Sequence, residues 1–249
     1  MIRAMICDLD GTLVQTEKLK ALSSARAATT LRPERNETDV IEAFKDVVGL
    51  SRHGVAQTLL ARFGLESAAW THMNSRWVET PWQAYSQIQL KIYNDLLANP
   101  EVIGRNQWPH HVELRKCAAE TCAKVGLATM SFCFQMQRVL KILKLDNVFD
   151  FVASHGDVET GKPDLEIYLL VADPLGVPPS ECLVIEDSPT GVEAALSAGV
   201  VCIAVSTPLT RQALHATGIL DDRWIVDDPD TLLTVVERTM ACQTGRKRA

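Results

Sequence analysis

Two acidic residues, separated by one position, stand out near the start of the chain. Asp8 and Asp10 directly follow a short apolar run at residues 4–7. In an extended strand, side chains two positions apart point to the same side, so both carboxylates can reach one site. Two such acids can divide the work of phosphoryl transfer: one attacks phosphorus, and the other protonates the leaving oxygen and later activates water.

A glycine follows these acids. Gly11 lets the backbone approach an anion closely, and its N–H can face a phosphoryl oxygen. Taken alone, the segment Asp8-Leu9-Asp10-Gly11 is also compatible with a capped turn or with part of a calcium-binding loop. The choice between these interpretations depends on what the rest of the chain brings to the same place.

A second pair of acids follows another apolar run. Glu186 and Asp187 come directly after residues 183–185, and the carboxyl ends of the strands in a parallel sheet face one crevice. Carboxylates that converge there repel one another unless a hard cation lies among them. Mg²⁺ suits such a site because it accepts a few carboxylates and keeps water and phosphate oxygens as further ligands. The alternative is that these acids cap the helix expected from Pro189 onward.

Two further segments supply groups that bind anions. Thr129 ends another apolar run, and Ser131 lies two positions later. A hydroxyl can therefore donate to a phosphoryl oxygen, or Thr129 can cap the helix expected from Phe132. Lys162 precedes Pro163, which can open a helix. Its ammonium can neutralise both a phosphoryl group and the crowded acids. An ordinary exposed lysine is the alternative.

Short apolar runs alternate with helical patterns through most of the chain. The runs are expected to be buried parallel strands, at residues 4–7, 124–129, 149–154, 183–185, 200–205 and 224–226. The helical patterns lie at residues 132–145, 163–173 and 189–198. This alternation predicts a doubly wound, Rossmann-like α/β fold with a parallel sheet.

Residues 17–98 follow a different pattern. They contain long amphipathic stretches and no convincing strand, which predicts an inserted helical domain. The stretches lie at residues 19–31, 39–48, 53–63 and 77–97. The segment 99–109 is expected to be the linker back into the sheet. The predicted domains are therefore a core of residues 1–16 and 99–249 and a helical insertion of residues 17–98.

The composition is that of an ordinary globular protein. Its 249 residues can bury a sizeable core, and a net charge of −6 argues against nucleic acid or an anionic membrane as the main partner. Seven cysteines without a Cys-x-x-Cys pair fit buried thiols in a reducing compartment. The N-terminus shows neither a signal peptide nor a membrane span, so we expect a cytoplasmic protein.

Taken together and in this order, the four segments resemble the four motifs of the haloacid dehalogenase superfamily, in the subfamily with a helical cap inserted after the first motif. The resemblance implies that Asp8 forms an aspartyl-phosphate and that Asp10 is the general acid and base. It implies that Thr129 and Lys162 hold the phosphoryl group of a small phosphorylated substrate. The implied ligands of Mg²⁺ are Asp8, the carbonyl oxygen of Asp10 and Asp187, with Glu186 supporting that shell.

Within the superfamily, the chain resembles β-phosphoglucomutase and related sugar-phosphate phosphatases. Gly49-Leu50-Ser51-Arg52 is similar to the mutase's Gly-Val-Ser-Arg loop, whose arginine grips the second phosphate of the substrate. The resemblance makes Ser51 and Arg52 candidate substrate contacts. The alternative is that Ser51 caps an ordinary helix.

Three positions depart from the mutase. Lys20 stands where the mutase has a histidine that helps to time proton transfer, and Phe132 and Cys133 replace a lysine and an asparagine that bind the distal phosphate. A sugar-phosphate phosphatase is therefore favoured over a mutase. Lys20 is a candidate contact to an anionic substrate, or a solvated charge on a helix face.

A rival interpretation from another class is a catalytically weak binding or regulatory module that keeps the fold. The presence of all the residues named for chemistry argues against it. For the enzyme, we expect the cap to open on hinges near Thr16 and residues 98–104. It would then close over the substrate and exclude bulk water.

Overall fold

The computed structural model describes residues 1–73, 78–108 and 124–245, without the side chains of residues 241–245. The chain divides into two compact units, which are Met1–Gln15 with Ile103–Ala249, and Thr16–Val102. We call the first the core unit and the second the helical unit. The domain boundaries expected from the sequence, after residues 16 and 98, stay a prediction.

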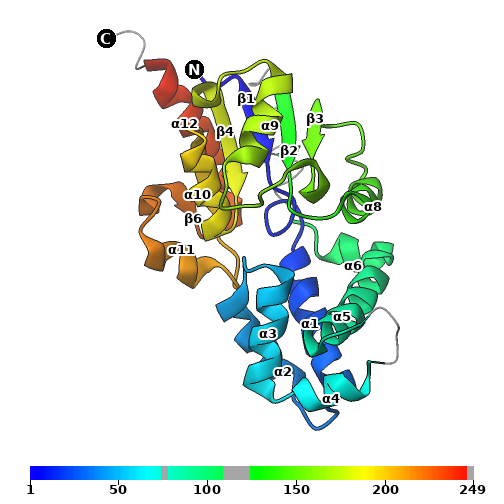
Figure 1. The fold of residues 1–249 in the computed structure, drawn as a ribbon. Helices are drawn as coiled ribbons and strands as arrows, with labels where there is room; N and C mark the ends of the chain where they lie inside the picture. The colour runs from blue at the N-terminus through cyan, green and yellow to red at the C-terminus, as the bar shows by residue number, and fades with distance from the viewer. Residues whose placement is uncertain (74–77, 109–123, 246–249) are drawn as a thin grey trace. The chain divides into compact units, whose positions relative to one another are not determined.

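The core unit contains a six-stranded sheet in which neighbouring strands are parallel. The strand order is β3-β2-β1-β4-β5-β6 (Figure 1). The bounds are β1 Ala4–Cys7, β2 Lys124–Ala128, β3 Phe151–Ala153, β4 Cys182–Glu186, β5 Val201–Val205 and β6 Ile225–Val226. The order reverses between β1 and β4, and doubly wound sheets bind ligands at such a switch point. The predicted fold class is confirmed.

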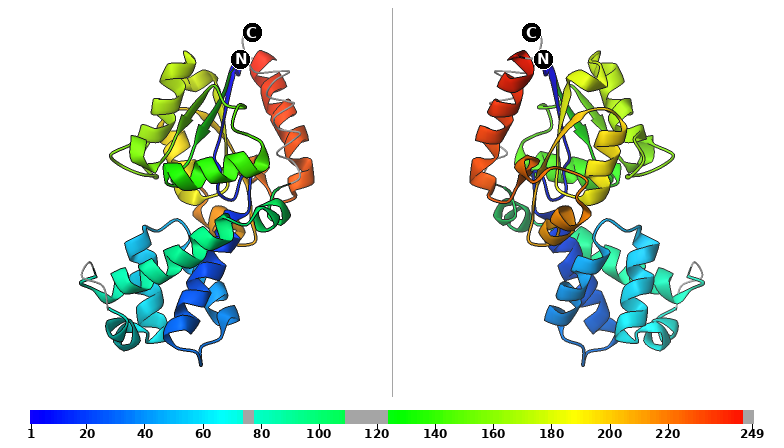
Figure 2. Two further views of the ribbon diagram at one scale, coloured as in Figure 1. Left: turned by 90° about the vertical axis from the view of Figure 1, so that its right-hand side faces the viewer. Right: turned by 90° about the vertical axis from the view of Figure 1, so that its left-hand side faces the viewer.

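Helices flank the sheet on both faces. Helices α9 and α10 cover one face, and α12 lies on the other (Figure 2). The bounds of the core-unit helices are α8 Cys133–Leu143, α9 Glu166–Leu175, α10 Pro189–Ser197, α11 Arg211–Thr217 and α12 Leu232–Gly245, and α6 Pro100–Arg105 spans the boundary between the two units. Helix α10 begins as its sequence predicts, because Ser188 Oγ accepts a hydrogen bond from the Gly191 N–H and Pro189 occupies the first position.

Two of these helices differ from the expectation. Helix α6 lies inside the segment 99–109, which was expected to be a linker, because the Asn99 side chain accepts hydrogen bonds from the N–H groups of Glu101 and Val102. Helix α9 begins three residues later than expected. The Asp164 side chain accepts from the Glu166 N–H and forms a turn just before the helix.

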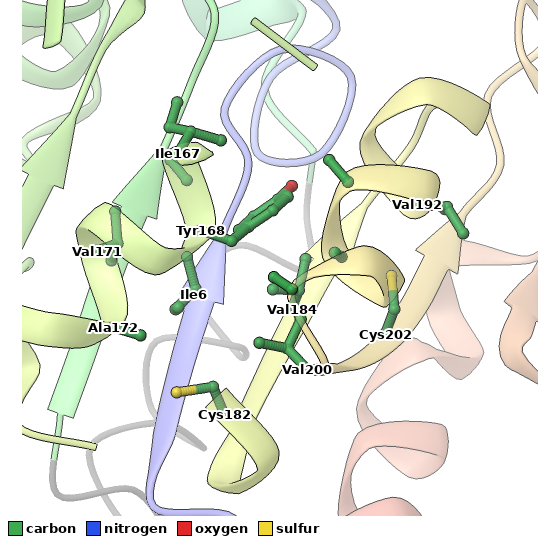
Figure 3. Packing of buried hydrophobic residues seen from close by; sticks show 14 of the residues in the cluster. Ile6, Ile167, Tyr168, Val171, Ala172, Cys182, Val184, Val192, Val200 and Cys202 are labelled. Atoms are coloured by element: carbon green, nitrogen blue, oxygen red, sulfur yellow. The ribbon is translucent and has the colours of Figure 1, made fainter. Parts of the chain in front are cut away.

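The strands present alternate side chains to opposite faces of the sheet. Ile6 on β1 and Val184 on β4 belong to the cluster that packs against α9 and α10. Figure 3 shows Tyr168 of α9 lying over these two residues, with its hydroxyl directed toward the carboxyl ends of the strands. Cys7 pairs with Leu127 on one side and with Ile185 on the other, so β1, β2 and β4 end at the same level. The residues that follow these strands therefore gather at one edge.

The helical unit contains helices and no strand within its described residues. Its elements are α1 Thr16–Leu31, α2 Glu37–Phe44, η1 Lys45–Val47, α3 Arg52–Phe63, α4 Glu66–Thr71 and α5 Pro81–Leu97. The helical insertion is thus confirmed, although α4 was not expected, and residue 77 of the expected last helix lies outside the described residues. Tyr85 of α5 is fully buried, and its hydroxyl donates to the Ser24 carbonyl oxygen over 2.9 Å.

The thiols agree in part with the expectation. Cys7, Cys182 and Cys202 are buried, whereas Cys133, the first residue of α8, is exposed. Cys117, Cys122 and the side chain of Cys242 lie outside the described residues. Within the described residues, no helix is both long and apolar enough to cross a membrane. The cytoplasmic location stays a prediction.

Gly126 of β2 lets α9 pack close to the sheet, and this contact yields a test. A Cβ atom at Gly126 would lie 2.4 Å from Val171 Cγ1 and 3.3 Å from Leu175 Cδ1. We expect Gly126→Ala to lower the free energy of unfolding by about 1–3 kcal/mol through overpacking, as measured by urea denaturation.

The matched control is Gly104→Ala in α6, where an added Cβ meets nothing within 4 Å. We expect it to raise the free energy of unfolding by about 0.5–1 kcal/mol, because alanine favours a helix more than glycine does. Equal effects of the two substitutions would contradict the close packing of α9 on β2.

Candidate active site

Four buried carboxylates lie at the carboxyl ends of β1 and β4 or just after them. The exposed fractions of these residues are 5% for Asp8, 9% for Asp10, 1% for Glu186 and 3% for Asp187. Backbone hydrogen bonds connect β1 and β4 as far as this edge, since the Asp8 N–H donates to the Ile185 carbonyl oxygen over 2.9 Å. The two acidic pairs that the sequence singled out are therefore brought to one edge of the sheet.

Lys162 lies among these acids and is almost fully buried, with 6% of its side chain exposed. Its ammonium donates to Asp8 Oδ1 over 2.7 Å, to Glu186 Oε1 over 2.5 Å and to the Ala128 carbonyl oxygen over 3.2 Å. Burial by itself lowers the pKa of Lys162, but the charges of Asp8 and Glu186 raise it above the ordinary value. The ammonium therefore keeps its proton, and the exposed-lysine alternative is excluded.

Glu186 accepts five hydrogen bonds, which occupy both of its carboxylate oxygens. Oε1 accepts from Lys162 and from the Tyr168 hydroxyl, the latter over 2.8 Å. Oε2 accepts from the N–H of Asp187, and from both the N–H and the hydroxyl of Ser188, over 2.9–3.1 Å. Burial raises the pKa of Glu186, but Lys162 and these donors lower it below the ordinary value overall. Glu186 is thus an anion held in one orientation.

Three residues around Glu186 were not expected as parts of the site. Tyr168 and Ser188 donate to it, and at Gly191 an added Cβ would lie 2.0 Å from Glu186 Oε1. In the sequence, Ser188 and Gly191 have the pattern of an ordinary helix start, and Tyr168 has the pattern of a buried position of α9. The helical period that places Tyr168 on the buried face was visible in the sequence, but its alignment with the end of β4 was not.

Asp10 is held by the hydroxyls that were expected to bind a phosphoryl group. Ser131 Oγ donates to Asp10 Oδ2 over 2.5 Å, and Thr129 Oγ1 donates to the same oxygen over 3.4 Å. The Ser131 N–H donates to Thr129 Oγ1 over 3.1 Å, which fixes the two hydroxyls relative to each other. To bind a phosphoryl oxygen, these hydroxyls would have to turn away from Asp10, so that role stays a prediction.

The loop after Asp10 folds back tightly. Gly11 has φ +88°, and its N–H donates to the Val14 carbonyl oxygen over 2.7 Å. Trp108 Nε1 donates to the Gly11 carbonyl oxygen over 2.7 Å. An added Cβ at Gly11 would lie 1.9 Å from Asp187 Oδ2, so the loop packs directly on that carboxylate. The expected contact of the Gly11 N–H with a phosphoryl oxygen would require its bond to Val14 to open.

The electrostatics of the edge suit a bound cation. Burial and the nearby charges of Glu186 and Asp10 raise the pKa of Asp8 to about 8, although Lys162 opposes this shift. Within the described residues, no group of three or more His, Cys, Asp or Glu side chains is arranged to hold a metal ion. Both oxygens of Glu186 already accept hydrogen bonds. The carboxylates that could serve as side-chain ligands of a cation are therefore those of Asp8 and Asp187. This all-oxygen set fits a hard divalent cation that takes its other ligands from backbone carbonyls, water or substrate.

Three of the expected substrate contacts belong to the helical unit. Lys20 on α1 pairs with Glu17, with 2.6 Å between Nζ and Oε1. Ser51 caps α3, because its Oγ accepts from the Gly54 N–H over 3.2 Å, and Arg52 is the first residue of that helix. The capping alternative for Ser51 is therefore what its local geometry shows. Contact of Lys20, Ser51 and Arg52 with a substrate stays a prediction.

Comparison with known families decides the classification. A family model described as a hydrolase, haloacid dehalogenase-like hydrolase, matches residues 2–199. The chain belongs to this family. The match extends from the first strand to the end of α10 and so includes every residue of the candidate site.

Individual relatives of the family are similar over most of the chain. Protein SUPPRESSOR OF QUENCHING 1, chloroplastic, of Arabidopsis thaliana is 32% identical over 223 residues, which are 87% of this chain and 19% of that protein. A phosphorylated carbohydrates phosphatase of Thermotoga maritima is 28% identical over 200 residues, which are 80% of this chain and 82% of that protein. Among solved structures, a β-phosphoglucomutase of Clostridium difficile is 22% identical with a TM-score of 0.72, covers 98% of this chain and 99% of its own, and shows the same fold.

The packing of Gly11 on Asp187 gives a second test. We expect Gly11→Ala to lower the free energy of unfolding for two reasons, which are the positive φ and the clash with the Asp187 carboxylate. The control is Gly176→Ala, which has φ +64° and no neighbour within 4 Å of an added Cβ.

Backbone strain alone should cost about 1–2 kcal/mol at Gly176. Gly11→Ala should cost about 1–3 kcal/mol more, because the Asp187 carboxylate must also move. Urea denaturation of both variants measures the difference, and a difference near zero would contradict the contact between the loop and Asp187.

Proposed function

We propose that this family member is a Mg²⁺-dependent phosphatase that hydrolyses a small phosphorylated metabolite, with a sugar phosphate as the substrate class. The observation that carries the proposal is the buried ionic cluster in which Lys162 bridges Asp8 and Glu186 at the ends of β1 and β4. A buried ammonium beside a buried carboxylate is suited to binding a dianionic group next to a nucleophile. The named activity of the Thermotoga maritima relative agrees with this substrate class.

The proposed reaction has two steps. A carboxylate oxygen of Asp8 attacks phosphorus, the bond between phosphorus and the ester oxygen breaks, and Asp10 gives its proton to the leaving alkoxide. A water molecule then attacks the aspartyl-phosphate while Asp10 takes up a proton from it, which frees Asp8 and releases inorganic phosphate. Lys162 neutralises charge on the transferring group, and Thr129 and Ser131 offer hydroxyls to its oxygens.

Mg²⁺ would be held by Asp8, Asp187 and the carbonyl oxygen of Asp10, and Glu186 would support this shell through its neighbour Asp187 rather than as a ligand. When bound, the cation supplies positive charge that offsets the repulsion between Asp8 and the phosphoryl oxygens. Burial makes this contribution large, because water does not screen the charges at the edge of the sheet.

The helical unit would serve as the cap, with hinges near Thr16 and residues 98–104. Closure would exclude bulk water during the attack by Asp8. Lys20, Ser51 and Arg52 are the residues through which this unit would recognise an anionic substrate. These roles rest on the family resemblance and on the charge of the side chains.

Hydrolysis is favoured over mutase chemistry by the start of α8. A mutase must hold a bisphosphate intermediate tightly, or water reacts with the phosphoenzyme first. Here Phe132 stacks with Phe134, their ring centroids 6.2 Å apart, and also contacts the His155 ring at 4.8 Å. An aromatic side chain packed in this way cannot take the place of a lysine that binds a distal phosphate.

The nucleophile can be tested with a generic aryl phosphate. We expect release of inorganic phosphate that requires Mg²⁺ and that falls at least about 1000-fold in Asp8→Asn, because the amide cannot form the aspartyl-phosphate. Asp146→Asn, an exposed position of the core unit, should keep wild-type activity. Wild-type turnover in Asp8→Asn would contradict the mechanism. Absence of turnover in the wild type on any phosphorylated substrate would favour the binding module.

The substrate class and the mutase alternative can be tested together. We expect a panel of phosphorylated sugars, nucleotides and acids to give the highest kcat/KM with a sugar phosphate. With β-glucose 1-phosphate and a bisphosphate primer, the product should be inorganic phosphate and not glucose 6-phosphate, because water is the acceptor. Coupled assays for the two products measure the ratio, and a majority of glucose 6-phosphate would identify a mutase.

A further inference from the structure

Tyr168 joins the charged cluster from the hydrophobic side of the core. The residue is fully buried on α9, beside Ile6 and Val184 (Figure 3). Its hydroxyl donates to Glu186 Oε1 over 2.8 Å, and the centroid of its ring lies 5.1 Å from Lys162 Nζ. One side chain thus contacts both partners of the ion pair, once by a hydrogen bond and once by a cation–π contact.

The ammonium of Lys162 has three N–H donors, and all three are used. They go to Asp8, Glu186 and the Ala128 carbonyl oxygen. Because a tetrahedral ammonium that donates to three fixed acceptors has little rotational freedom, its direction toward Asp8 depends on where the other two acceptors lie. The Ala128 carbonyl is fixed by β2, so the other acceptor, the side chain of Glu186, is the one whose position depends on side-chain contacts.

The orientation of Glu186 depends in turn on its donors. Oε2 is held by Asp187 and Ser188, whereas Oε1 is shared between the Lys162 ammonium and the Tyr168 hydroxyl. Tyr168 is therefore the neutral group that fixes the position of Glu186 Oε1, the oxygen to which Lys162 donates. Burial and the charge of Glu186 raise the pKa of Tyr168 well above its ordinary value, so the hydroxyl stays a donor.

We propose that Tyr168 is a positioning residue, whose hydroxyl fixes Glu186 so that Lys162 is held against the reacting carboxylate of Asp8. The proposal rests on the proposed function, in which Asp8 is the nucleophile. Tyr168 touches neither substrate nor metal in this scheme. It acts through Glu186 and Lys162, and its ring packs in the core as well.

The kinetic test compares two buried tyrosines. Tyr168→Phe removes the hydroxyl and keeps the ring, and Tyr85→Phe does the same in the helical unit, where the hydroxyl donates to the Ser24 carbonyl oxygen. We expect kcat for an aryl phosphate to fall about tenfold in Tyr168→Phe while KM changes less than about threefold, since a group that orients a reacting carboxylate acts mainly in the transition state. Tyr85→Phe should leave kcat within about twofold of the wild type.

Two kinetic outcomes would overturn the proposal. Unchanged kcat in folded Tyr168→Phe would mean that the residue only packs. A similar loss of kcat in Tyr85→Phe would mean that any lost buried hydroxyl lowers activity through stability. Circular dichroism of each variant at the assay temperature establishes that the folded protein is compared.

A second measurement does not require turnover. In protein labelled with ¹⁵N-lysine, the buried ammonium of Lys162 should give a slowly exchanging ¹H–¹⁵N signal, which Lys162→Met identifies by its loss. We expect this signal to shift or broaden in Tyr168→Phe and to stay unchanged in Tyr85→Phe. An unchanged signal in Tyr168→Phe would refute the positioning role. If the signal changes in Tyr168→Phe but the wild-type protein has no phosphatase activity, the contact between Tyr168 and the ion pair is supported and only the proposed function is refuted.

Discussion

The candidate site depends on one electrostatic constraint, which is the burial of several carboxylates at the ends of two neighbouring strands. Asp8 and Glu186 are each less than one-tenth exposed, and carboxylates so placed repel each other strongly in a medium that water does not screen. The Lys162 ammonium between them offsets this repulsion through bonds of 2.7 and 2.5 Å. Removal of this lysine would leave buried charges uncompensated, which is costlier than never burying them. The segment before α9 is therefore tied to both strands by charge.

The sheet and its glycines make this arrangement possible. Register between β1 and β4 brings Asp8 level with Glu186, and the reversal of strand order between them opens the edge to a ligand. Gly11 and Gly191 then let backbone approach the carboxylates of Asp187 and Glu186 to distances that a Cβ atom would forbid. The N–H groups of these two glycines donate elsewhere, to the Val14 carbonyl oxygen and to Ser188 Oγ, so their contribution at the acids is close packing.

Much of this could be predicted from the sequence, because the deciding signals are local. Acids directly after apolar runs, and the alternation of strand and helix, predicted the parallel sheet and the gathering of Asp8 and Glu186. Contacts that depend on the depth of packing could not be predicted. The bonds from Tyr168 to Glu186 and from Ser131 to Asp10 require the distances between α9, β2 and the strand ends, which no pattern of residue types encodes. Helix α6 was missed because its length of six residues is too short for a periodic pattern.

The division of labour between the adjacent acids Glu186 and Asp187 follows from the geometry of a strand. Side chains alternate between the two faces, and Val184 packs toward α9, so Glu186, two positions later, also points toward α9 and meets Tyr168 there. Asp187 comes one position later and lies against Gly11 instead. The same reasoning carries Asp8 toward Lys162, because Ile6 faces α9. One acid of the second pair thus anchors the ammonium, while the other would be the ligand of the proposed cation.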